Sequence, residues 1–228
     1  MNAQELPSVD TVPVSVGQHV SIFAVHDRDT QCVDYKILKY LQNHRTPARN
    51  RFWLTVSNSF VLSPAPLLGM FVGGLCADDR NSSETLYSNA GESAVSVLLN
   101  SGLTMGAKSL VRRPRPWVAY DGDLVCLQTV RSTSFPSGHT SLTFAAATSL
   151  SLAYPEWYVV IPSYLWAGAV GFSRMYIGAH YPSDVLAGAL LGAGSALLVH
   201  YVWNQLWKRN ETPIAPQKGV VIPFVFVF

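Results

Sequence analysis

The sequence predicts an all-α fold, an integral membrane helical bundle of about five to six transmembrane helices. Two observations support this prediction. The 228-residue chain has 49% hydrophobic and only 13% charged residues, whereas soluble proteins carry about 25% charged residues. The apolar residues also gather into long runs, and polar clusters lie between these runs. The net charge of +2 is too small to indicate nucleic acid as a partner.

Residues 1–52 are expected to form an N-terminal segment that contains one amphipathic helix. The apolar positions of this helix are Val33, Ile37, Tyr40 and Leu41, and its polar positions are Lys36, Lys39 and Gln42. This spacing predicts either a helix that lies in the membrane interface or a surface helix that packs on the bundle. The pattern of a signal peptide is not visible after Met1.

Residues 53–209 are expected to form the transmembrane domain. The candidate spans are Trp53–Cys76, Asn89–Ala107, Thr140–Ala153, Trp157–Phe172 and Val185–Trp207. The last run is the strongest, because it has no charged residue when His200 is neutral and exceeds the roughly 20 residues that a spanning helix needs. It ends with tryptophans followed by Lys208 and Arg209, as at a membrane interface. The shorter runs could instead be core helices of a soluble bundle, and the tail 210–228 ends in a stretch too short to span.

The order of these spans predicts that three polar clusters lie on one face of the membrane. The clusters occupy residues 108–116, 136–139 and 173–184. Two spans precede the first cluster, two separate the second from the third, and one follows the third. The chain therefore returns to the same face at each cluster, and residues far apart in sequence are expected to meet at one end of the bundle.

The three clusters together contain groups that bind a phosphate. Lys108, Arg115 and Arg174 supply positive charge, and the planar arginine side chain matches the geometry of phosphate oxygens. Ser137 and Gly138 are expected to begin a helix, with Pro136 in its first turn. The amide groups at such a helix start form an anion-binding site. A glycine there has no side chain, so an anion can approach the backbone closely.

The second and third clusters contain groups suited to phosphate transfer. His180 and Asp184 are four residues apart, with Pro182 opening a helix between them. This spacing brings the carboxylate within reach of one imidazole nitrogen and strengthens the other as a nucleophile. His139, on a different helix, could protonate a leaving oxygen.

Each of these features has a less specific interpretation when it is taken alone. The basic residues Arg112, Arg113 and Arg115 are common as interfacial anchors. His139 or His180 could bind a metal, but no second carboxylate or cysteine lies near them at ligand spacing. The ordered combination of all three clusters favours the catalytic interpretation.

The clusters match the pattern K-x6-RP, PSGH, SR-x5-H-x3-D, and the chain resembles the type 2 phosphatidic acid phosphatase (PAP2) superfamily over Lys108–Gly192. The resemblance implies a PAP2/haloperoxidase-like core and metal-independent hydrolysis through a phosphohistidine, without a cofactor. It implies that His180 is the nucleophile, that Asp184 orients it and that His139 is the general acid and base. It assigns phosphate binding to Lys108, Arg115, Ser137, Gly138 and Arg174. Membrane members of the superfamily have six spans, so the first is expected to be absent here or replaced by the interfacial helix.

The apolar runs resemble those of the lipid phosphatase branch, which implies a phosphorylated lipid in the bilayer as the substrate. Candidates by resemblance are undecaprenyl diphosphate, phosphatidic acid, phosphatidylglycerophosphate and a lipid A phosphate. A vanadate-dependent oxidase of the same superfamily and a non-enzymatic transporter remain as alternatives. The oligomeric state is not predicted.

The resemblance also implies a bacterial inner membrane with the active site on the periplasmic face. The positive-inside rule argues against this orientation, because five cations of the N-terminal segment lie on the active face. They are Lys36, Lys39, Arg45, Arg49 and Arg51. An oxidising compartment would allow a disulfide between Cys32 and Cys126, and the alternative is that these residues and Cys76 are free thiols.

Overall fold

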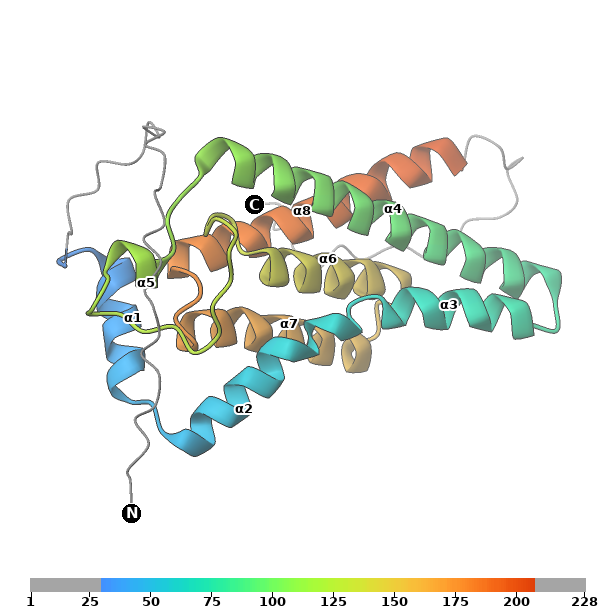
Figure 1. The fold of residues 1–228 in the computed structure, drawn as a ribbon. Helices are drawn as coiled ribbons and strands as arrows, with labels where there is room; N and C mark the ends of the chain where they lie inside the picture. Colours follow the sequence, from blue (N-terminus) through green and yellow to red (C-terminus); the bar gives the residue numbers. More distant parts are fainter. Residues whose placement is uncertain (1–29, 208–228) are drawn as a thin grey trace, which may run out of the picture.

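The computed structural model describes residues 30–207, and this part of the chain is helical without a β-strand (Figure 1). The all-α prediction is therefore confirmed. The tail 210–228 and the cations Lys208 and Arg209 lie outside the described residues. The helices are α1 (Val33–Asn43), α2 (Pro47–Asn58), the 3₁₀ helix η1 (Ser59–Leu62), α3 (Ala65–Cys76), α4 (Arg80–Val111), α5 (Pro116–Ala119), α6 (Gly138–Ala153), α7 (Trp157–Tyr176) and α8 (Pro182–Trp207).

Helix α6 lies at the centre of the bundle and contacts α4, α7 and α8. Small residues allow these contacts to be close: Ala145 of α6 is fully buried. A side chain at Gly192 of α8 would place its Cβ 2.1 Å from the carbonyl oxygen of Ser141. Glycine at this position therefore lets the backbones of α6 and α8 come into close contact.

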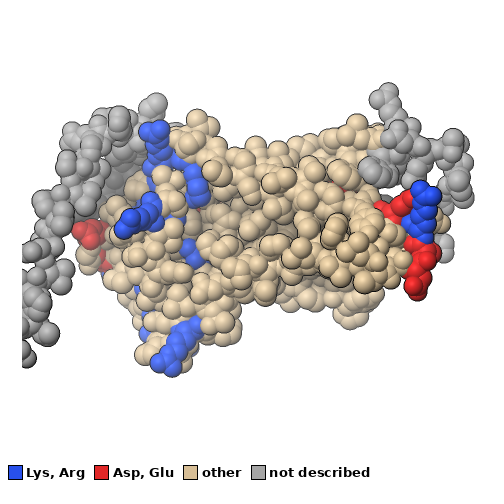
Figure 2. All heavy atoms as spheres, turned by 45° about the vertical axis from the view of Figure 1, so that its right-hand side comes forward, with Lys and Arg blue, Asp and Glu red and all other residues tan. Residues whose placement is uncertain are grey.

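Three segments of the described chain are long and apolar enough to cross a membrane: Pro47–Cys76, Arg80–Ala119 and Pro182–Leu206. Large apolar side chains point outward from them, including Leu68, Leu75, Leu98, Met105 and Leu190. Figure 2 shows charged side chains at the two ends of the molecule and a broad uncharged belt between them. This distribution is that of an integral membrane protein.

The other two predicted spans correspond to α6 and α7, which are not among these three segments. Helix α6 has 16 residues, fewer than the about 20 that cross a bilayer core. Both helices pack in the same bundle as the three longer segments. The helical membrane bundle is confirmed, and the number of five spans stays a prediction.

The first membrane segment begins earlier than predicted and is not a continuous helix. Its first helix, α2, starts at Pro47 rather than Trp53, because the hydroxyl of Thr46 accepts a hydrogen bond from Arg49 N (3.3 Å) and caps the helix. The 3₁₀ turn η1 and Pro64 then interrupt the segment before α3. This interruption lies against α6.

Helix α1 packs on the bundle through a face that matches the predicted one only in part, because Leu41 packs against the core. Leu38 is 2% exposed, whereas Val33 and Tyr40 of the predicted apolar face are 71% and 63% exposed. Lys39 and Gln42, predicted to face solvent, instead donate hydrogen bonds to the carbonyl oxygen of Asp123 (3.1 and 2.9 Å). These two polar residues lie on the packed side because polar groups of the loop after α5 hold the helix together with the buried Leu38. The exposed apolar residues are still free to meet a membrane surface.

Candidate active site

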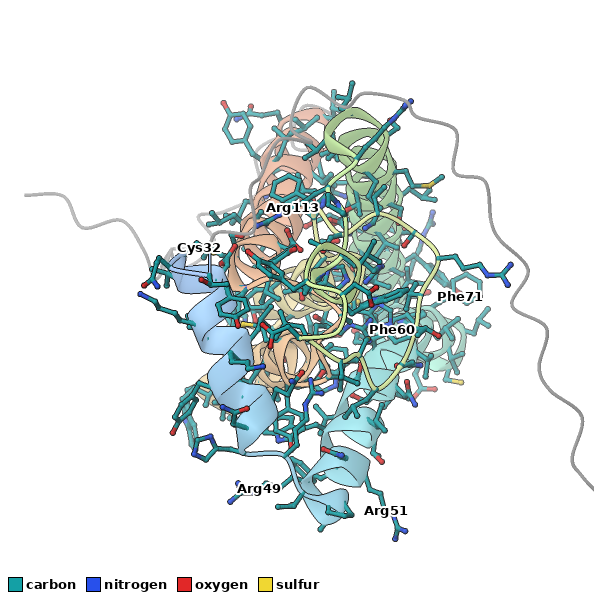
Figure 3. The ribbon with its side chains drawn as sticks, turned by 60° about the vertical axis from the view of Figure 1, so that its left-hand side comes forward. Cys32, Arg49, Arg51, Phe60, Phe71 and Arg113 are labelled. Atoms are coloured by element: carbon teal, nitrogen blue, oxygen red, sulfur yellow. The ribbon has the colours of Figure 1, made fainter. Side chains whose placement is uncertain are left out.

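The three polar clusters meet at one end of the bundle, as the order of the spans predicts. Arg115 Nη1 of the first cluster lies 3.3 Å from His180 Nε2 of the third. The amide of Ser137, in the second cluster, donates to the carbonyl oxygen of Asp184 (3.1 Å). Figure 3 looks onto this end of the molecule, where Arg113 lies near the centre while Arg49 and Arg51 point away from the bundle.

Arg115 is held rigidly beside His180. It is the N-cap of helix α5 and is 4% exposed. Its Nε donates to the carbonyl oxygen of Ser132 (2.7 Å), and its Nη1 donates to that of Ala179 (2.7 Å). A planar group with several donors fixed in this way can face a phosphate at the nucleophile without reorganising.

Lys108 lies at the end of α4, close to the start of α6. Its ammonium group donates to the carbonyl oxygen of Thr133 (2.8 Å). A Cβ at Gly138 would lie 4.0 Å from Lys108 Cε. The lysine therefore borders the helix start that was predicted as an anion site.

Arg174 supplies the third cation from the last turn of α7, with 1% of its surface exposed. Its Nη1 donates to the hydroxyl of Ser57 in α2 (2.6 Å), whereas Nε has no hydrogen-bond partner among residues 30–207. The side chain is thus held in place and keeps donor capacity for an anion.

The start of α6 differs from the prediction in one respect. The helix begins at Gly138 with Ser137 as its N-cap, so Pro136 lies before the cap rather than in the first turn. The prediction failed because the backbone of Ser137 is extended (φ −72°, ψ 108°), which leaves Gly138 as the first helical residue. The amides of the first turn lack partners within a helix and point toward the helix end, which is where an anion binds.

The predicted pairing of His180 with Asp184 is close but is not a hydrogen bond. Helix α8 begins at Pro182 as predicted, and His180 Nδ1 lies 3.6 Å from Asp184 Oδ2. Within the described part of the chain Nδ1 has no hydrogen-bond partner. Burial, together with the charges of Arg115 and Arg174, lowers the pKa of His180 to about 4. The imidazole is therefore neutral over most of the pH range, as a nucleophile must be.

His139 is in the first turn of α6 and is partly buried. The ring of Phe60 from η1 packs against it in a tilted arrangement, with a centroid distance of 3.8 Å. His139 is close enough to Arg174, His180, Arg115 and Lys108 to interact with their charges. All eight predicted site residues therefore gather at this end of the bundle, with three cations and one carboxylate among them.

Four residues that support this arrangement were not predicted from the sequence: Ser57, Phe60, Arg113 and Ser134. The hydroxyl of Ser134 donates a hydrogen bond to Asp184 Oδ2. Arg113, assigned to the membrane interface, instead binds Asp184 Oδ1 (2.7 Å). A signal for it exists, because a residue before proline favours extended backbone, in which Arg113 and Arg115 project to the same side. Ser57 and Phe60 have no such signal, since they belong to a distant apolar run.

The three cysteines are free thiols in the structure, the second of the two alternatives considered. Cys32 Sγ lies 3.9 Å from the hydroxyl of Tyr120, and Cys126 Sγ donates to the carbonyl oxygen of Gln128 (3.1 Å). Burial raises the pKa of the Cys126 thiol.

Comparison with known proteins gives matches to phosphatases, which agrees with the phosphate-binding groups of the site. The sequence model of the PAP2 superfamily matches residues 90–208, more than half of the chain. A lipid A 4'-phosphatase of Bacteroides thetaiotaomicron is 34% identical over 87 residues, which cover 37% of this chain and 38% of that protein. A decaprenylphosphoryl-5-phosphoribose phosphatase of Mycobacterium tuberculosis is 35% identical over 134 residues, 57% of this chain and 67% of that protein. The chain thus spans less than half of the length of the first relative.

A solved structure shares the fold. It is a transmembrane PAP2 type phosphatidylglycerolphosphate phosphatase from Bacillus subtilis, with a TM-score of 0.63 and 24% identity over 82% of this chain and 90% of that one. At this identity the likeness concerns the fold.

Proposed function

The chain belongs to the PAP2 superfamily, and from this membership we propose that it hydrolyses a phosphomonoester or a diphosphate on a membrane lipid. The observation that carries the proposal is the meeting of Lys108, Arg115 and Arg174 around two histidines at one end of a membrane bundle. Three cations against one carboxylate suit a doubly charged phosphate. The vanadate-dependent oxidase and the transporter are less well supported, because the named relatives are phosphatases.

In the first step, His180 Nε2 attacks the phosphorus atom in line with the bond to the leaving oxygen. This nitrogen is the reactive one because Nδ1 faces Asp184, whereas Nε2 faces Arg115. The bond between Nε2 and phosphorus forms as the bond from phosphorus to the lipid oxygen breaks. In the free protein, burial and the neighbouring cations lower the pKa of His139 to about 3, and the negative charge of the bound phosphate raises it again. The protonated His139 then gives its proton to that oxygen, and the cations with the amide of Gly138 hold the charge on the remaining oxygens.

In the second step, His139 accepts a proton from water, and the resulting hydroxide attacks the phosphohistidine. Inorganic phosphate leaves, and both histidines return to their starting states. Asp184 stabilises the positive charge that the imidazole of His180 acquires when it is phosphorylated. Ser137 keeps the start of α6 in place through two contacts. Its backbone amide donates a hydrogen bond to the carbonyl oxygen of Asp184, and its hydroxyl lies 2.9 Å from that of Thr140.

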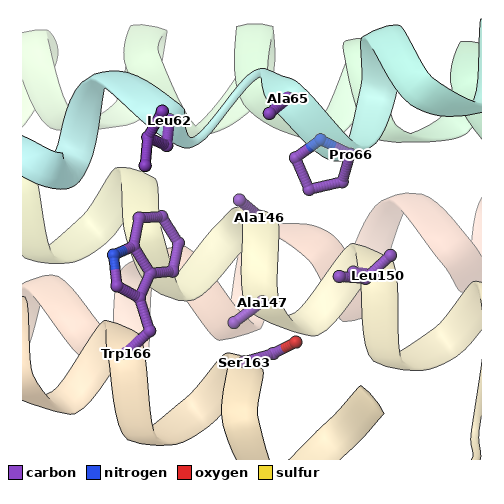
Figure 4. A pocket seen from close by; sticks show the side chains of 8 residues that line it. All are labelled: Leu62, Ala65, Pro66, Ala146, Ala147, Leu150, Ser163 and Trp166. Carbon is purple, nitrogen blue, oxygen red and sulfur yellow. The ribbon is translucent and has the colours of Figure 1, made fainter.

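A cavity on the same face of α6 supports a lipid substrate. His139, Ala146 and Leu150 lie on one face of this helix, at spacings of seven and four residues. Ala146 and Leu150 line an apolar cavity of about 290 Å³ between the Leu62–Pro66 segment, α6 and α7 (Figure 4). Seven residues of helix correspond to about 10 Å. A hydrocarbon chain can therefore extend from a phosphate at His139 into this cavity, within the membrane.

The test is phosphate release in detergent micelles, with EDTA present, from undecaprenyl diphosphate, phosphatidic acid, phosphatidylglycerophosphate and lipid A. We expect release from at least one of these lipids and inhibition by vanadate, which adopts the five-coordinate shape of the transition state. Activity that EDTA removes and Mg²⁺ restores would contradict the metal-independent mechanism.

We also propose that the active end faces the periplasm of a bacterial inner membrane. The named relatives come from bacteria, and two of the five opposing cations have structural roles. Arg45 donates to the carbonyl oxygens of Tyr176 and Val125, and Lys39 binds Asp123. An impermeant maleimide applied to intact spheroplasts should label Cys32 at the active end and spare the exposed Cys76 at the end of α3. The reverse labelling would contradict this orientation.

A further inference from the structure

Helix α1 reaches the carboxylate beside the nucleophile through one arginine. Asp34, in the first turn of α1, accepts a hydrogen bond from Arg113 Nη2 at its Oδ2 atom (2.9 Å). Its Oδ1 atom accepts from the amide of Ser183 (3.1 Å), and the Ser183 hydroxyl also donates to Oδ2. The N-terminal helix is therefore tied to the segment that begins α8.

Arg113 connects Asp34 to the active site. Its Nη1 donates to Asp184 Oδ1 and to the hydroxyl of Ser183, both at 2.7 Å. Its guanidinium carbon lies 3.8 Å from the centre of the Tyr181 ring, so the planar group is also held from one side. These contacts leave the arginine only 30% exposed.

The contact with Arg113 determines the orientation of the Asp184 carboxylate relative to His180. Asp184 is fully buried. Its Oδ2 atom accepts from Ser134 and from the amide of Tyr181 (3.0 Å), and it faces His180 Nδ1. Among residues 30–207, Oδ1 accepts a hydrogen bond only from Arg113. Because a carboxylate is planar, fixing Oδ1 fixes the direction in which Oδ2 points.

We propose that Asp34 and Arg113 are positioning residues that hold Asp184 for the reaction of His180, a role that rests on the proposed phosphatase function. Arg113 sets the rotation of the Asp184 carboxylate. Asp34 holds Arg113 and balances its charge, which leaves the negative charge of Asp184 to stabilise the phosphorylated imidazole. Helix α1 thereby completes the active site although it contributes no group that touches the substrate.

The same helix provides a matched control. The ammonium group of Lys39 in α1 donates to two oxygens of Asp123, in the loop after α5. One is the backbone carbonyl oxygen and the other is a carboxylate oxygen. This second attachment of α1 does not involve Asp34, Arg113 or Asp184. Lys39→Met therefore loosens α1 without changing the contacts that connect Asp34, Arg113 and Asp184.

The experiment compares Asp34→Asn, Lys39→Met, Arg113→Ala and the double variant Asp34→Asn/Arg113→Ala. The substrate is the member of the four-lipid panel that the parent protein hydrolyses fastest, and thermal unfolding is measured for each variant. We expect Asp34→Asn to lower kcat about 10-fold, since small errors in position are costly in catalysis, with KM changed less than about twofold. Lys39→Met should keep kcat within about twofold at a similar unfolding temperature. In the Arg113→Ala background, Asp34→Asn should have no further effect on kcat.

Two results would overturn the proposed positioning role of Asp34 and Arg113. One is an equal loss of kcat in Asp34→Asn and Lys39→Met, because α1 would then act only by its attachment. The other is an undiminished effect of Asp34→Asn in the Arg113→Ala background, because Asp34 would then not act through Arg113. A parent protein that releases no phosphate would instead overturn the proposed function, and this role with it.

Discussion

Replacing Arg115 with lysine keeps the positive charge beside His180 and removes the planar group that carries it. In the structure three nitrogens of this side chain donate to Ser132 and Ala179, and one of them also lies 3.3 Å from His180 Nε2. A lysine has a single nitrogen and cannot occupy these positions together. Arg115→Lys should therefore lose at least one charge-assisted contact with the phosphate in the transition state.

The size of the loss follows from the number of contacts. A hydrogen bond to a charged group contributes about 1.5–3 kcal/mol, and about 1.4 kcal/mol corresponds to a tenfold change. We expect kcat/KM to fall about 10- to 150-fold in Arg115→Lys. The carbonyl oxygens of Ser132 and Ala179 would also lose donors, so a lower unfolding temperature should accompany the change.

The assay is steady-state phosphate release from a lipid of the panel, with thermal unfolding measured in parallel. Arg112→Lys is the matched control, because Arg112 is exposed and its Nε bonds only to the carbonyl oxygen of Ser109 (2.9 Å). We expect its kcat/KM to stay within about twofold of the parent value. Unchanged kcat/KM in Arg115→Lys, with folded protein, would refute the role of Arg115 in holding the phosphate.

Two further predictions concern the nucleophile and the cavity. Burial and neighbouring arginines lower the pKa of His180 to about 4, and only the neutral imidazole attacks, so kcat/KM should fall as the pH decreases through about 4. A pH profile corrected for the ionisation of the substrate checks this, and an acid limb near 6.5 that belongs to His180 would contradict it. Ala147→Phe, which fills the apolar cavity, should raise KM at least about tenfold for a long-chain lipid phosphate while changing it less than about twofold for a short-chain analogue, in kinetics measured side by side. Equal effects on both substrates would show that the cavity does not hold the hydrocarbon chain.

The sequence was sufficient to predict the helical membrane bundle and the meeting of the three clusters. Both conclusions depend on strong one-dimensional signals, namely the length of apolar runs and the number of spans between clusters. The 26-residue helix α8 illustrates this: its long apolar run and the proline at its start appear directly in the sequence. The span count became uncertain where the run was short, as in α6.

Features that depend on side-chain contacts across the bundle could not be predicted in the same way. Helix α1 was expected to show its polar side to solvent, but Lys39 and Gln42 bind Asp123, which is more than 80 residues away. The spacing of His180 and Asp184 predicted proximity correctly, whereas the 3.6 Å separation depends on Ser134 and Arg113, which already occupy the carboxylate. Phe60 of η1 lies against His139, and no periodic pattern in the apolar run indicates this contact.

The most direct test of the account is to trap the covalent intermediate. The protein is mixed with a lipid phosphate labelled with ³²P, quenched in base within milliseconds, since phosphohistidine is labile in acid, and digested for peptide analysis. We predict one labelled phosphohistidine at His180, no label in His180→Ala, and no phosphate release by that variant. Full turnover by His180→Ala, or label on any other residue, would contradict the assignment of His180 as the nucleophile.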